Sequence, residues 1–156
     1  SEVPTKPFSF TKDEWIGWFE TALQPFAVML KEATAAEESA ADIKDLVVKD
    51  QTEVYTMEHQ LGISVGWILF DSTEQGLCQI RFVSKEEDVS SYLGGDIKRA
   101  VVRASDPDFR LLPLDETNEA YTDFCSDLWK TGDTKERNGI TYETDSYGDD
   151  FTVRVS

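Results

Sequence analysis

The sequence predicts an α+β fold in a single domain, 1–156, with a largely antiparallel sheet. Helical and strand patterns come in separate blocks, without the regular strand–helix alternation that a parallel sheet needs. Neighbouring strand patterns are joined by short polar turns, which connect antiparallel strands. The composition, 40% hydrophobic and 12% aromatic over 156 residues, is sufficient for one hydrophobic core.

The first helix is expected to begin at Lys12. Thr11 and Glu14 stand at the spacing of a capping box, in which each side chain accepts a hydrogen bond from the backbone N–H of the other residue. Phe10 and Trp15 flank this box as a hydrophobic staple does. Both features are local, so they predict the start of the helix independently of the rest of the fold.

A helical seam of apolar residues follows, with spacings that alternate between four and three. Such spacing fits either the core-facing side of a helix or an arm that forms a homo-oligomer as a coiled coil. Three successive alanines would hold a partner weakly, which favours the core. Pro25 removes a helix hydrogen bond, so we expect two helices, about 12–23 and 26–48. The seam consists of Trp15, Phe19, Ala22, Phe26, Met29, Ala33, Ala36, Ala40, Ile43 and Val47.

Strand patterns come next. A short strand is expected over 52–58, and alternating bulky residues predict strands over 61–70 and 77–83. A short polar turn separates the last two, so they should pair as antiparallel neighbours. One buried face of this pair is expected to carry Val65, Trp67, Cys78 and Ile80.

The middle of the chain is less regular. A second capping box over 84–87 predicts a short helix that ends at the glycine pair 94–95. Residues 97–104 fit both a helix and a strand. The segment 109–114 is expected to be a strand, limited by Pro113 to an edge or an end of the sheet.

The last third predicts a helix and a hairpin. Apolar residues at helical spacing indicate an amphipathic helix over about 117–131. Asn138 and Gly139 form a turn dipeptide. Beyond it, alternating apolar residues over 140–144 and 151–155 predict two paired strands with an acidic tip.

The formal net charge is −16, and it is concentrated in two flanks. Residues 1–60 hold twelve acidic against five basic side chains, and residues 106–150 hold thirteen against four. Residues 61–105 are nearly balanced, at six against five. A field of this sign repels nucleic acid and anionic membranes and attracts cationic surfaces. We therefore expect no direct contact with nucleic acid or membrane, and a basic protein surface as the partner.

Catalytic motifs are few. The chain has one histidine, His59, and two cysteines, Cys78 and Cys125, which stand in apolar patterns. Such thiols are expected to be buried, reduced and unreactive. With so few soft ligands, no transition-metal site is expected, and no cofactor is expected either. The many carboxylates leave open an oxygen-ligand Mg²⁺ or Ca²⁺ site, or an acid pair for hydrolysis. The reduced thiols, and first residues that do not follow the pattern of a signal peptide, favour a cytoplasmic protein.

The acidic row, Asp115, Glu119, Asp123 and Asp127, is the most suggestive feature, because its members stand four residues apart. On a helix these carboxylates would form a line opposite the apolar side, where like charges repel one another. The row is either a solvated face or a docking surface that imitates the charges of a nucleic-acid strand. Four further acids of the hairpin would extend its field: Glu143, Asp145, Asp149 and Asp150.

These features together predict a small acidic binding module. Such a protein would act as an inhibitor or adaptor by docking its negative surface on a basic protein, for example one that handles nucleic acid. Acidic DNA mimics of phages offer an analogy of charge, though not of any motif. Two alternatives remain open: a carboxylate-based or metal-dependent hydrolase, and an assembly protein that oligomerises through residues 15–47.

Overall fold

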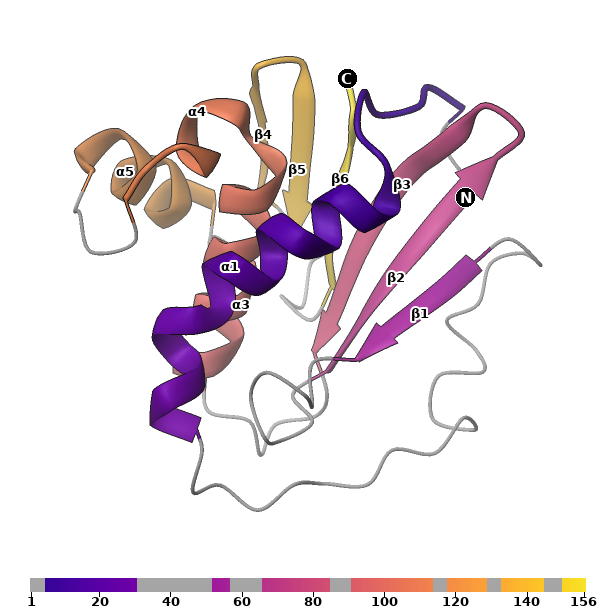
Figure 1. Cartoon of the computed structure of the whole chain (residues 1–156). Helices are drawn as coiled ribbons and strands as arrows, with labels where there is room; N and C mark the ends of the chain where they lie inside the picture. The colour runs from indigo at the N-terminus through magenta and orange to yellow at the C-terminus, as the bar shows by residue number, and fades with distance from the viewer. Residues whose placement is uncertain are drawn as a thin grey trace.

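The structure is a computed structural model, and it describes residues 5–30, 52–56, 66–84, 91–113, 118–128, 133–144 and 150–156. These residues form an α+β fold in which helices pack against one face of a six-stranded antiparallel sheet (Figure 1). In chain order the elements are α1 (Lys12–Leu30), β1 (Thr52–Thr56), β2 (Gly66–Thr73), β3 (Gly76–Ser84), α3 (Ser91–Ser105), α4 (Pro107–Arg110), α5 (Glu119–Leu128), β4 (Thr134–Arg137), β5 (Ile140–Thr144) and β6 (Asp150–Val155).

The sheet consists of two meanders joined at its centre. Its strand order is β1-β2-β3-β6-β5-β4, so each meander is made of strands that follow one another in the chain. The two meanders meet where β3 pairs with β6, with Phe82 opposite Phe151. Both side chains are fully buried in the core between the sheet and the helices. The predicted strands 52–58 and 140–144 with 151–155 are confirmed as β1, β5 and β6.

The predicted pairing of the second and third strand patterns is confirmed, but not the predicted shared face. Trp67 lies opposite Val83, whereas Ile80 lies opposite Phe70. Residues that lie directly opposite share a face of the sheet, so Trp67 and Ile80 stand on different faces. Trp67 is buried, as predicted, in a small cluster with Val83 on the face away from the helices. Val65 lies outside the described residues.

A β-bulge explains this difference. Ser72 lies opposite Leu77 but Asp71 lies opposite Gln79, so Cys78 is an extra residue in β3. Next to the turn, odd-numbered residues of β2 lie opposite even-numbered residues of β3, as Thr73 lies opposite Gly76. The sequence pattern suggests this relation for the whole pair of strands. One extra residue reverses that relation for the rest of the pair, because side chains alternate with a period of two.

Helix α1 confirms the capping box and corrects the predicted break. The Glu14 backbone N–H donates to Thr11 Oγ1 at 3.1 Å, and the Thr11 N–H donates to Glu14 Oε1 at 2.9 Å. The helix continues through Pro25 to Leu30, so its predicted end near residue 23 is wrong. A proline costs one backbone hydrogen bond, and here the buried preceding turns hold the helix in place. Residues 31–48 of the second predicted helix lie outside the described residues.

Helix α3 settles an ambiguity and corrects a second helix end. Residues 97–104 are helical, and the pair Gly94 and Gly95 lies inside α3 rather than at its end. Glycine costs about 1 kcal/mol in a helix interior. The burial of Ile97 and Val101 in the core offsets this cost, since each apolar side chain contributes about 1.5–3 kcal/mol.

The core accounts for the first part of the helical seam. Trp15, Phe19 and Ala22 are buried in it, and the Trp15 ring meets the Phe70 ring of β2 edge-on at 5.5 Å. These positions therefore pack within the chain itself. The seam positions from 33 to 47 lie outside the described residues. In the part of the chain that the structure describes, no helix is long and apolar enough to span a membrane.

Candidate functional site

Helix α5, predicted over about 117–131, is fixed to the molecule along its inner side. Cys125 is fully buried, and the Phe124 ring meets the Tyr142 ring of β5 edge-on at 5.4 Å. The Tyr121 hydroxyl donates a hydrogen bond to the Arg99 carbonyl oxygen of α3 at 2.6 Å. These contacts determine which side of α5 faces the solvent. The helix lies beside the β4–β5 end of the sheet, across the molecule from β1 (Figure 1).

The outer side of α5 carries the acidic row. Glu119, Asp123 and Asp127 are exposed and lie one helical turn apart. Asp115 lies outside the described residues. The Lys135 ammonium of β4 forms an ion pair with Asp127, at 2.9 Å from its Oδ2 atom. An exposed pair of this kind contributes at most about 1 kcal/mol.

The helix dipole acts differently on the two ends of the row. Glu119 stands in the first turn of α5, where the partial positive charge of the helix end favours an acid. Asp127 stands in the last turn, where the dipole and the neighbouring Asp123 both disfavour it. The ion pair with Lys135 offsets this repulsion, and the sequence pattern gave no indication of it because Lys135 lies on another element.

Glu143 lies on the other side of the sheet from α5. Its neighbour Tyr142 faces α5, so Glu143 faces away from the helices. There its carboxylate accepts from Thr134 Oγ1 at 3.3 Å and pairs with Arg154 at 3.5 Å. The acidic row and Glu143 therefore do not form one surface.

Three of the eight predicted site residues thus share one surface, Glu119, Asp123 and Asp127. Asp150 begins β6, where it lies opposite Val83. Asp145 and Asp149 lie outside the described residues. The acidic tip of the hairpin is therefore not part of the surface that the structure describes.

Three titratable groups lie along the inner side of α5, with Tyr121 and Cys125 on the helix itself and Tyr142 on the neighbouring β5. Burial raises the pKa of the Cys125 thiol to about 12, and the charge of Arg99 only partly opposes this effect. Burial also raises the pKa of the Tyr121 and Tyr142 hydroxyls well above the ordinary value of tyrosine. Both cysteines are free and buried, in agreement with the sequence. Neutral groups of this kind support packing and do not supply a nucleophile at neutral pH.

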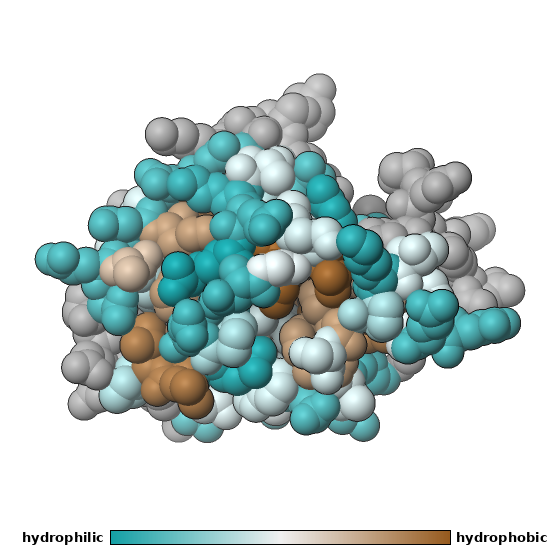
Figure 2. Space-filling model, turned by 90° about the horizontal axis from the view of Figure 1, so that it is seen from above, coloured by the Kyte–Doolittle hydropathy of each residue, from teal (hydrophilic) through white to brown (hydrophobic). Residues whose placement is uncertain are grey.

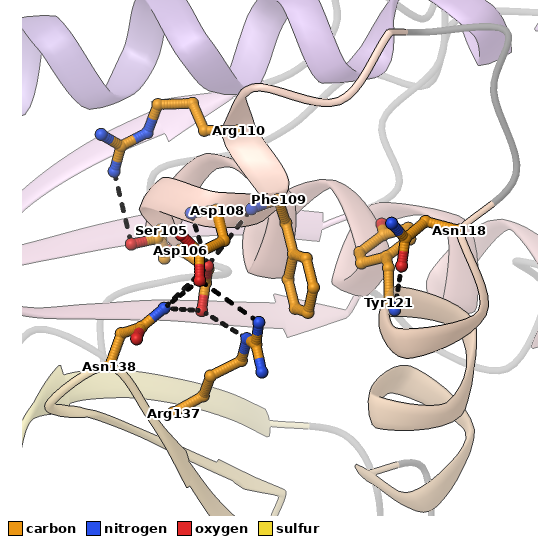
Figure 3. A network of polar contacts seen from close by, with 9 residues as sticks. All are labelled: Ser105, Asp106, Asp108, Phe109, Arg110, Asn118, Tyr121, Arg137 and Asn138. Carbon is orange, nitrogen blue, oxygen red and sulfur yellow. Dashed lines mark hydrogen bonds and ion pairs between the residues drawn. The ribbon is translucent and has the colours of Figure 1, made fainter.

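A buried carboxylate that the sequence patterns did not predict lies at the end of α3. Asp106 is fully buried, and its Oδ1 atom accepts from the backbone N–H groups of Asp108 at 2.8 Å and Phe109 at 3.2 Å (Figure 3). It thereby caps α4, and the predicted strand over 109–114 is wrong. The sequence does contain a signal, since an aspartate before a proline is the pattern of a helix cap followed by its first residue.

The same carboxylate joins the helices to the β4–β5 turn. Arg137 Nε lies 3.1 Å from Asp106 Oδ2, and Asn138 Nδ2 donates to both Asp106 oxygens at 3.2 Å. Asp108 Oδ2 accepts from Asn138 Nδ2 at 3.1 Å and from Arg137 at 3.3 Å. We refer to Asp106, Asp108, Arg137 and Asn138 as the Asp106 cluster. Figure 3 shows its side chains converging from α4 and from the turn.

Arg110 extends this polar layer toward α1. Its guanidinium lies 3.6 Å from the centre of the Trp18 ring and donates to the Ala104 carbonyl oxygen at 3.0 Å. Burial lowers the pKa of Arg110, and the charge of Asp106 opposes this effect. Each of these contacts joins elements of the chain to one another, which is a structural role.

Seen from above, the described part is largely hydrophilic, and its hydrophobic areas are separate from one another (Figure 2). Leu111, after α4, is 83% exposed. Among the described residues, no group of three or more His, Cys, Asp or Glu side chains is placed to hold a metal ion.

No protein-family model matches this chain, and neither a curated protein nor a solved structure matches it. Its function is therefore inferred from its own charge and geometry.

Proposed function

We propose that this protein is a small acidic binding module that docks on the basic surface of another protein and acts as an inhibitor or adaptor. The observation that carries the proposal is the outer side of α5, where Glu119, Asp123 and Asp127 are exposed in one line. The inner side of the same helix is held by buried contacts. A helix that is already ordered presents its charges without a further loss of conformational entropy on binding.

The charge of the whole chain supports the same proposal. A net charge of −16 produces a long-range field that accelerates encounters with a cationic partner. Carboxylates about 6 Å apart along a helix can occupy a basic groove that otherwise holds phosphates. In such a groove, Lys or Arg side chains of the partner would relieve the repulsion within the row, as Lys135 does for Asp127 in the isolated protein.

The proposal is tested with two double variants of equal charge change. Glu119→Gln with Asp123→Asn alters the row, and Glu74→Gln with Glu136→Gln alters exposed acids elsewhere. The partner is captured from the source cell at low salt, purified, and titrated with each variant at two salt concentrations. We expect the row variant to weaken binding about tenfold or more and to flatten the salt dependence of binding. The control variant should weaken binding several times less.

Equal weakening by both double variants would contradict the proposal, because binding would then follow net charge rather than this surface. Capture of no basic protein at low salt would contradict it as well. Neither the hydrolase nor the assembly alternative has a specific observation in its favour among the residues that the structure describes.

A further inference from the structure

The turn between β4 and β5 contains a reactive dipeptide. Asn138 and Gly139 both have positive φ angles, of 53° and 76°. Only two asparagines occur in the chain, and the other, Asn118, precedes Glu119. An asparagine followed by glycine is prone to deamidation, because no side chain hinders attack by the next backbone nitrogen. A Cβ atom at Gly139 would meet nothing within 4 Å, so the folded structure leaves open space beside this residue.

The atom that must leave in deamidation is the one that the Asp106 cluster holds. Asn138 Nδ2 donates to Asp106 Oδ1 and Oδ2 at 3.2 Å each and to Asp108 Oδ2 at 3.1 Å (Figure 3). Asp106 is fully buried and is itself fixed by the backbone of α4. The side-chain amide of Asn138 is therefore restrained as long as these contacts are closed.

We propose that Asn138 is a deamidation site, that the reaction occurs when its contacts with Asp106 open, and that the product prevents those contacts from forming again. The Gly139 backbone nitrogen loses its proton to solvent and attacks Asn138 Cγ. The new N–Cγ bond forms as the Cγ–Nδ2 bond breaks, and Nδ2 takes up a proton from water and leaves as ammonia. Water then opens the resulting succinimide at either carbonyl, which gives aspartate or isoaspartate.

The product reverses the electrostatics of the turn. Where the two N–H groups of an amide reached three carboxylate oxygens, a carboxylate would face the carboxylates of Asp106 and Asp108. Arg137 contacts both of these acids, and Arg110 and Tyr142 also lie near Asp106. One arginine in contact would then serve three carboxylates. Isoaspartate would in addition lengthen the backbone of a two-residue turn, which would disturb the register of β4 with β5.

The first experiment compares the folded protein with the same chain unfolded in urea, both incubated at neutral pH and then digested with trypsin. Peptides are scored for conversion of amide to acid and for isoaspartate. We expect conversion at Asn138 to be at least about tenfold faster in the unfolded chain, because opening is then complete. Asn118 lies in another peptide and should stay intact, so it serves as the internal control. Equal rates in both states, or no conversion of the unfolded chain, would overturn the proposal.

Two variants test protection by the cluster within the folded protein. Asp108→Ala removes one acceptor of the Asn138 amide and should accelerate conversion several-fold. Asp123→Ala removes an exposed acid on α5, remote from the turn in the chain, and should leave the rate unchanged. Equal rates in the two variants would show that the Asp106 cluster does not protect Asn138.

Substitutions that imitate the product test its effect. Asn138→Asp should lower the melting temperature by about 5 °C or more at pH 7. Like charges raise the pKa of a carboxyl group in the folded state, so the deficit should shrink as pH falls toward 4. Asn118→Asp is the matched control, since an aspartate still accepts from the Tyr121 N–H at the start of α5. If Asn138→Asp melts like the unchanged protein at pH 7, the product does not disturb the cluster.

Discussion

At the scale of single residues, Asp106 connects more of the fold than any contact that the sequence pattern indicates. Its two oxygens contact the backbone of α4 and the side chains of Arg137 and Asn138. These two side chains follow Asp106 by about thirty residues in the chain. The Arg137 guanidinium also lies 4.3 Å from the centre of the Phe109 ring. A buried carboxylate is stable only when hydrogen bonds and ion pairs satisfy it. The loss of Asp106 should therefore destabilise both α4 and the β4–β5 turn.

We predict that Asp106→Ala destabilises the protein by about 3–5 kcal/mol, because it leaves Arg137 without its buried partner and removes the cap of α4. Asp108 is largely exposed, and Asp108→Ala should cost no more than about 1 kcal/mol. Urea denaturation of both variants measures the difference. Similar losses in the two variants would contradict the central role of Asp106.

Local and distant contacts differ in how far the sequence predicts them. The capping box of Thr11 and Glu14 lies within one helical turn, and it was predicted correctly. The partners of Asp106 are brought together by the sheet, and no spacing in the sequence records that contact. The same holds for the ion pair of Asp127 with Lys135, which changes the electrostatics of the acidic row.

At the scale of elements, the helix ends that the sequence predicted wrongly share one physical cause. Pro25 and the pair Gly94 and Gly95 are strong local signals for a helix end, yet α1 and α3 continue past them. Packing against the core supplies more free energy than these residues cost. The bulge at Cys78 is a feature of a strand that was likewise not predicted, since no residue type in β3 indicates it.

Buried titratable groups of α5 and β5 lead us to predict that the protein loses stability at alkaline pH. Cys125, Tyr121 and Tyr142 are neutral at pH 7, and burial raises each pKa in the folded state. Each group therefore contributes stability that is complete below its unfolded pKa, about 9 for the thiol and 10 for the phenols. That contribution falls as pH rises through about 9 to 12. Urea midpoints at pH 7, 9 and 10.5 should decline, and Cys125→Ala should make the decline less steep.

For the outer side of α5 we predict two substitutions whose effects on the stability of the protein have opposite signs. Asp123→Asn should stabilise the isolated protein by a few tenths of a kcal/mol, because it removes like-charge neighbours. Lys135→Gln should destabilise it by about 0.5 kcal/mol, since Asp127 then faces the helix dipole without this ion pair. Thermal melts at low and high salt measure both effects, which should shrink as salt rises. Stabilisation by Lys135→Gln would contradict this account of the row.

At the scale of the whole molecule, the two meanders depend on one central pairing. Residues 79–83 of β3 pair with residues 150–154 of β6, and the aromatic pair Phe82 and Phe151 lies at this junction. The α+β class and the antiparallel strands were predictable from local patterns. The junction was not, because its partners are about 70 residues apart.

We predict that Phe151→Ala costs about 3–5 kcal/mol, because it leaves a cavity beside a fully buried neighbour at the junction. Thr152→Ala, one position along and facing the other side of the sheet, should cost less than about 1 kcal/mol. Fluorescence and circular dichroism should still show one shared transition in urea for Phe151→Ala. Two separate transitions would mean that the meanders unfold independently.

The central place of β6 has a consequence for the time course of folding. A ribosome adds about 5–20 residues per second, so β3 waits roughly 3–13 s between its own synthesis and that of its partner strand. During this interval β1, β2 and β3 can form a meander, but one edge of β3 has no neighbour and the side chains of Ile80 and Phe82 lack their later core neighbours Val153 and Phe151. An unpaired, apolar strand edge is a template for aggregation. The nascent chain therefore passes through a period in which it depends on dilution or on chaperones, and the acidic charge already synthesised would help to keep copies apart.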